Sequence, residues 1–196
     1  RERDALVGTM QRLVMVVLSV LAPVLAFALV LFLMSLPLTG LAGLWDGWIS
    51  AAALTLAAAG GAYVLMNAAI GLGDEEKPPH VVLHWSAMIL ALVVLPLATL
   101  AMTALLLRVG QYGWSPERLW GVVAAGVAIA YGVAGWWAVG RWRRAFEGAI
   151  RTLQTRLAIG VCALALILAL PIVDFGAISA RDQLARLASG AVQPQQ

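Results

Sequence analysis

The chain has 196 residues, of which 62% are hydrophobic and only 12% are charged, and its formal net charge is +3. Soluble domains carry roughly 45–50% apolar and about 25% charged residues. The composition therefore excludes a soluble fold, because no core of this size could bury so much apolar surface. The single cysteine, Cys162, excludes an intrachain disulfide.

Five apolar runs are long enough to cross a bilayer as helices, which takes about 20 residues each. The runs are continuous and not alternating, which favours helices over a membrane barrel. The predicted spans are 13–36, 48–72, 81–107, 119–139 and 157–173. We therefore predict an all-α, polytopic transmembrane bundle over residues 1–175, followed by a tail over 176–196 that contains a short helix.

Three features inside the spans predict local structure. Pro23 and Pro96 predict kinks, which membrane helices tolerate when a neighbour satisfies the freed carbonyl. The tryptophans, Trp136 among them, fall near predicted span ends and are interpreted as interfacial anchors. Asn67 is predicted to hydrogen-bond a neighbouring helix.

The segment before the fifth span has a helical apolar stripe. Trp142, Phe146, Ile150 and Leu153 recur at spacings of four, four and three. This pattern predicts a separate interfacial helix over 141–157, with its apolar face in the acyl boundary and its arginines among lipid headgroups. The arginines predicted to contact headgroups are Arg141, Arg143, Arg144 and Arg151.

The distribution of Lys and Arg predicts the orientation. Nine of the 13 lie on the side of the N-terminus and four lie on the opposite side. The positive-inside rule then places the N-terminus in the cytoplasm and the C-terminus outside, as an odd number of spans requires. The basic loops are explained by this topology and do not indicate nucleic-acid binding.

No catalytic motif is found in the chain, so we predict neither catalytic residues nor a cofactor. His80 and His84 have the i, i+4 spacing of a metal-binding pair, and they are the weak candidates for a metal site. The alternative is that both lie in the interface at the start of the third span, since no further His or Cys completes a closed site.

The segment 111–118 is a polar turn between two apolar runs. Ser115 is a natural N-cap for the next helix, and Pro116 suits its first position. In the tail, Ser179 to Asp182 matches a loose capping box, which predicts a helix that continues to about Ala188 and is stopped by Gly190.

This turn and the tail are expected to be neighbours, because they precede and follow the same hairpin of spans. Within this polar face we predict an ion pair of Arg118 with Asp174 or Asp182. The predicted polar face comprises Tyr112, Gly113, Trp114, Glu117, Arg118, Asp174, Ser179, Arg181, Gln183 and Arg186.

The sequence Tyr-Gly-Trp-Ser-Pro-Glu-Arg, at 112–118, resembles the Tyr-Gly-(Leu/Trp/Ile)-(Thr/Ser)-Pro-x-Arg turn of the domain of unknown function 4153 family of bacterial membrane proteins. The tail from Asp174 to Leu187 is similar to the segment after that family's last span. The resemblance implies further spans upstream, a further extracytoplasmic segment downstream, and no established catalytic residues.

Three functions are compatible with these observations. The leading hypothesis is a non-enzymatic binding or assembly subunit of the bacterial inner membrane with an extracytoplasmic polar face. The alternatives are a transporter or channel component, and an enzyme acting on lipid-linked or envelope substrates through Asp174 or Glu117. The expected partners are membrane lipids and other membrane subunits or further parts of the same protein.

Overall fold

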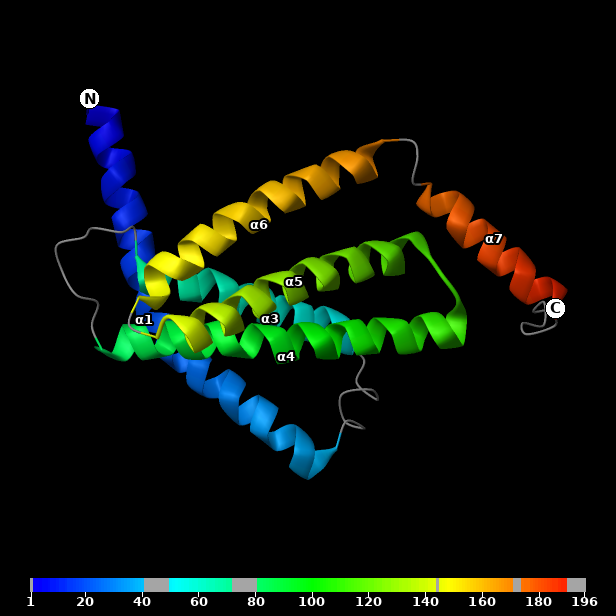
Figure 1. Ribbon diagram of the computed structural model, residues 1–196, viewed down its shortest axis with the longest axis horizontal. Helices are drawn as coiled ribbons and strands as arrows, with labels where there is room; N and C mark the ends of the chain where they lie inside the picture. The colour runs from blue at the N-terminus through cyan, green and yellow to red at the C-terminus, as the bar shows by residue number, and fades with distance from the viewer. Residues whose placement is uncertain (1, 41–49, 72–80, 144, 171–173, 190–196) are drawn as a thin grey trace.

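The computed structural model describes residues 2–40, 50–71, 81–143, 145–170 and 174–189. All regular structure in these ranges is helical, which confirms the all-α prediction (Figure 1). The helices are α1 (Glu2–Thr39), α3 (Ala51–Ile70), α4 (Val81–Tyr112), α5 (Pro116–Arg141), α6 (Phe146–Ala169) and α7 (Phe175–Ala188).

Five of these helices are long and apolar enough to span a membrane, which confirms the predicted number of spans. The first helix, however, continues through Pro23 and Pro37 and ends at Thr39. The residue after it, Gly40, has a positive φ of 72°. The first span therefore extends a few residues beyond its predicted end, and Pro37 lies inside the helix.

The predicted interfacial helix over 141–157 is wrong as a separate element. Helix α6 begins at Phe146 and continues without a break to Ala169. Three of the four stripe residues face protein: Phe146 and Ile150 are 0% and 1% exposed, and Leu153 packs on the same core. The fourth, Trp142, precedes α6 and is 39% exposed. The stripe binds the start of α6 to the bundle instead of to the acyl boundary.

The core lies where α3, α4 and α5 run side by side (Figure 1). Helix α4 is central in this core, and its Leu90 and Leu97 are completely buried. Helix α1 crosses α3 and α4 at an angle. The buried set is rich in alanine, as expected for membrane helices, whose association depends on close backbone packing.

Helices α4 and α5 approach closely at two glycines of α5. A Cβ at Gly132 would lie 2.7 Å from the Cα of Leu95, and one at Gly135 would lie 2.8 Å from the carbonyl oxygen of Ala91. Real Cβ atoms do not approach backbone this closely, so both positions require glycine. This contact fixes how α5 sits on α4, and hence where the turn between them lies.

The proline of α4 has a specific partner on α5. Pro96 has no N–H, so the carbonyl of Leu92, four residues earlier, has no helical donor. The indole Nε1 of Trp136 donates a hydrogen bond to this carbonyl at 2.8 Å. Trp136 therefore has a role between helices in addition to the predicted interfacial one.

Candidate functional site

The turn between α4 and α5 is built by one glycine and one cap. Gly113 has φ +80°, and its N–H donates to the carbonyl of Val109 at 2.8 Å. Ser115 is the N-cap of α5, and its Oγ accepts from the N–H of Arg118 at 3.3 Å. The predicted cap, with Pro116 in the first turn, is thus confirmed.

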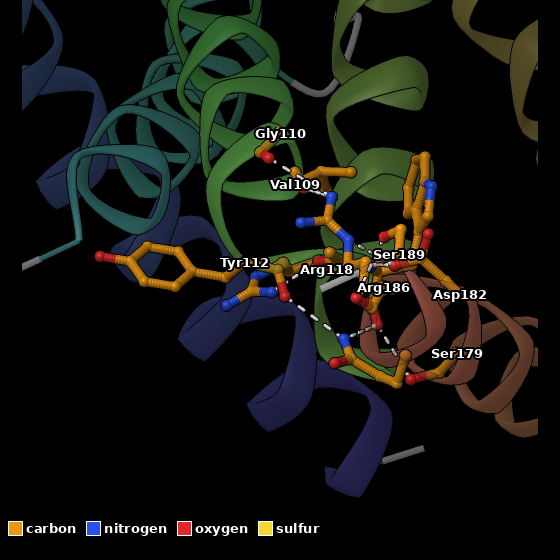
Figure 2. A network of polar contacts seen from close by, with 11 residues as sticks. Val109, Gly110, Tyr112, Arg118, Ser179, Asp182, Arg186 and Ser189 are labelled. Atoms are coloured by element: carbon orange, nitrogen blue, oxygen red, sulfur yellow. Dashed lines mark hydrogen bonds and ion pairs between the residues drawn. The ribbon is translucent and has the colours of Figure 1, made fainter. Parts of the chain in front are cut away.

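Helix α7 lies against this turn, which confirms that loop and tail are neighbours (Figure 2). The Trp114 N–H donates to Asp182 Oδ2 at 2.9 Å, and Ser179 Oγ donates to the Trp114 carbonyl at 2.9 Å. Gln183 Nε2 donates to the carbonyls of Tyr112 and Trp114 at 3.3 and 3.4 Å. Three side chains of one helix therefore hydrogen-bond to the backbone of the turn.

Arg186 completes this arrangement. Its Nη2 donates to the carbonyls of Val109 and Gly110 at 3.0 and 3.3 Å, and its Nε pairs with Asp182 Oδ2 at 3.2 Å (Figure 2). The Val109 carbonyl also accepts from the Gly113 N–H, whereas the Gly110 carbonyl is among the last of α4, which have no donor within a helix. Arg186 therefore supplies a C-terminal cap to α4 at Gly110. We refer to Ser179, Asp182, Gln183 and Arg186 together as the α7 clip.

The start of α7 differs from the predicted capping box. The helix begins at Phe175, and the N-cap is Asp174, whose Oδ1 accepts from the N–H of Ala177 at 3.0 Å. Ser179 is instead in the second turn, where its hydroxyl reaches the α4–α5 turn. The helix ends at Ala188 as predicted, and Gly190 lies outside the described residues.

The predicted ion pair of Arg118 with Asp174 or Asp182 is wrong. Asp182 pairs with Arg186, and Asp174 caps α7. Arg118 donates from Nη1 to the carbonyl of Gly113 at 2.6 Å, and its guanidinium carbon lies 5.5 Å from the ring centroid of Tyr112. Arg118 therefore stabilises the turn from the α5 side, independently of α7.

Not every residue of the predicted polar face joins these contacts. Glu117 and Arg181 are exposed, and within the described part of the chain neither side chain makes a hydrogen bond or ion pair. An aromatic contact that was not predicted adds to the site. The rings of Trp120 and Phe175 pack edge to face, with their centroids 5.1 Å apart. This contact joins α5 to the first turn of α7.

The other end of the bundle carries a second set of polar contacts. His84 Nδ1 lies 3.1 Å from Glu147 Oε1 and so ties α4 to the start of α6. The Nη2 of Arg151 donates to the carbonyls of Ile70 and Gly71 at the end of α3. Arg151 thus has an intramolecular role that the headgroup prediction did not include.

For several residues at this end the structure leaves the prediction untested. Arg141 and Arg143 are exposed, so their contact with headgroups stays a prediction, and Arg144 lies outside the described residues. His80 also lies outside them. Among the described residues, no three His, Cys, Asp or Glu side chains come close enough to hold a metal ion.

A cavity of about 420 Å³ opens beside the α4–α5 turn. It lies where the starts of α3 and α5 meet the last turns of α4. Its lining comprises Ser50, Ala52, Ala53, Leu56, Leu105, Arg108, Ser115, Glu117, Arg118 and Gly121. The sequence placed Arg108 and Arg118 on one side of the membrane, but it gave no sign that α3 completes a cavity with them.

The fold and these two polar ends define a class: a multi-pass helical membrane protein with five candidate spans. Comparisons with protein-family models, with curated proteins and with solved structures find no match.

Proposed function

We propose that this chain is a non-enzymatic binding or assembly subunit of the bacterial inner membrane, and that the middle of α6 is the surface on which a further membrane span packs. The observation that carries the proposal is that the start of α6 and the next helix, α7, are both fixed to the bundle, while the middle of α6 is almost entirely exposed.

The start of α6 and the helix that follows it are held in different ways. At its start, Phe146 and Ile150 are buried in the core, and Glu147 and Arg151 contact α4 and α3. After its end, the α7 clip fixes the chain to the α4–α5 turn. The position of α6 is therefore set by contacts outside its middle section.

Between these points α6 leans away from α5 (Figure 1). Only 6% of its most apolar stretch is buried, against 44% for α3 and α4. Ile159 and Leu166 are 67% and 70% exposed. Lipid tails solvate such side chains as well as protein does, so helices in membranes associate by close packing. A span held apart from its own bundle leaves its faces free for such packing with another span.

Two observations from the sequence support the remaining parts of the proposal. The excess of Lys and Arg on the N-terminal side supports a cytoplasmic N-terminus and, with it, an α7 clip outside the cytoplasm. The resemblance of the segment from Tyr112 to Gly190 to the domain of unknown function 4153 family supports a bacterial membrane and further spans. Such spans, in the same protein or in a partner subunit, are the proposed occupants of the α6 surface.

Site-specific cross-linking tests this proposal. In a Cys162→Ala background, a single cysteine replaces Leu166 on α6 or, as a control, Val24 on α1, which is similarly exposed at 65%. The cysteine is labelled in membranes of the source cells with a benzophenone maleimide, whose ketone inserts into neighbouring C–H bonds on illumination, and products are resolved by mass. We expect one discrete adduct for Leu166→Cys and none for Val24→Cys. No adduct from Leu166→Cys, or equal adducts from both, would overturn the proposal.

A further inference from the structure

We propose that the cavity between α3, α4 and α5 binds the phosphate group of an anionic amphiphile, with Arg108 and Arg118 at the phosphate. This site does not depend on the assembly role of α6, since none of its lining residues belongs to that helix.

The place of the cavity in the fold suits an amphiphile. Its volume of about 420 Å³ is within the range of small-molecule sites, which is about 300–1,000 Å³. It is lined by the first residues of two spans and the last turns of a third, so it lies at one end of the bundle. A membrane-embedded bundle has its headgroup layer at this level.

The two arginines supply the charge. Arg108 is exposed, and within the described residues its guanidinium has no hydrogen bond or ion pair. Arg118 uses Nη1 for the carbonyl of Gly113 and keeps other N–H groups for a ligand. A planar guanidinium fits phosphate with two parallel hydrogen bonds, and these charge-assisted bonds are stronger than neutral ones.

The start of α3 adds to the positive electrostatic potential that the two arginines create in the cavity. Its N-cap, Ser50, makes no side-chain hydrogen bond to the first turn. The N–H groups of that turn have no acceptor within the helix, and the helix dipole favours an anion beside them. Ser50, Ala52 and Ala53 all line the cavity. Glu117 is the opposing charge, because it lines the same cavity and its carboxylate repels an anion.

The apolar part of the lining distinguishes an amphiphile from a soluble anion. Leu56 and Leu105 lie beside the charged residues in the same cavity. A Cβ at Gly121 would lie 3.0 Å from Cδ2 of Leu105, so glycine leaves this side chain its space. A phospholipid would bury part of its acyl chains against this apolar surface, whereas a free phosphate has no apolar group to bury there.

Native mass spectrometry of the full chain in detergent tests the site. The protein is titrated with phosphatidylglycerol, with zwitterionic phosphatidylcholine and, separately, with glycerol 3-phosphate. We expect retention of phosphatidylglycerol in preference to phosphatidylcholine. Binding of glycerol 3-phosphate with equal affinity would assign the site to soluble phosphates, keeping the phosphate site and overturning only the amphiphile. Binding of none of the three above background would overturn the whole proposal.

Two variants with opposite expected effects on affinity, together with one control variant, locate the ligand. Arg108→Gln removes a charge-assisted hydrogen bond and is expected to weaken binding about tenfold or more. Arg181→Gln, an exposed arginine on α7 outside the cavity, is the matched control and should bind as the wild type does. Glu117→Gln removes the repelling carboxylate and should tighten binding, so the proposal stays testable if Arg108→Gln fails to fold. Equal losses in both arginine variants, or no gain in Glu117→Gln, would overturn it.

Discussion

At the residue scale, the polar end of the molecule depends on Gly113. Its φ of +80° lies in the left-handed region, and a Cβ there would lie 2.8 Å from Arg186 Nε and Gln183 Nε2 and closer still to Asp182. Gly113→Ala is therefore expected to lower the free energy of unfolding by about 1–3 kcal/mol through backbone strain, and to displace α7 as well. Thermal unfolding in detergent measures the first effect, and amide hydrogen exchange over 175–188 measures the second.

The control for this prediction is Gly110→Ala, in the last turn of α4. A Cβ at Gly110 meets nothing within 4 Å, and alanine favours a helix. This variant should be as stable as the wild type or slightly more stable. Equal behaviour of the two variants would contradict the account of the turn.

Residue types in the sequence predicted part of this site. The Ser-Pro pair at 115–116 and the parity of the spans predicted the cap and the proximity of turn and tail. They did not predict which side chains meet, since Arg186 and Val109 are 77 positions apart and their contact depends on how α7 lies across the turn. For the same reason the sequence predicted an ion pair of Arg118 that the described part of the structure does not contain.

At the element scale, the pairing of α4 and α5 rests on glycine contacts and on the hydrogen bond from Trp136 to the Leu92 carbonyl. Trp136→Phe keeps a ring but leaves this carbonyl without a donor, and we expect a loss of about 0.5–1.5 kcal/mol in stability. In a Pro96→Ala background the same change should cost much less, because the alanine introduced there has an N–H that can donate to the Leu92 carbonyl.

A double-mutant cycle over Trp136 and Pro96, measured by denaturation in mixed micelles, checks this expectation. Additive effects of the two changes would show that the indole contributes only packing. As a control at another tryptophan of the same helix, Trp120→Phe should show no coupling to Pro96, because its ring contacts Phe175.

Element types and approximate bounds were predictable, since continuous apolar runs and helix starts are local signals. The junction of 141–157 with the fifth span was not. The arginines in that segment suggested a break, but Arg151 finds its acceptors at the end of α3. A charged side chain satisfied by another helix end does not interrupt its own helix.

Asn67, expected to bond to a neighbouring helix, donates to the carbonyl of Tyr63 in its own helix.

At the scale of the whole molecule, the orientation is the most direct prediction. In a Cys162→Ala background, a cysteine at Tyr112, which is 64% exposed, should react with a membrane-impermeant maleimide on intact cells whose outer membrane has been opened. A cysteine at Arg143, exposed at the opposite end, should react only after the inner membrane is permeabilised. The reverse pattern would invert the proposed topology and place the α7 clip in the cytoplasm.

The sequence by itself determined the class of the protein, the number of spans and which loops share a side, because hydropathy acts locally along the chain. The tertiary structure alone decided that α6 stands away from α5, that Arg186 caps α4, and that three helix ends enclose a cavity with two arginines. These features depend on the relative placement of whole helices. That placement is set by close contacts such as those at Gly132 and Gly135, where the absence of a side chain decides the fit.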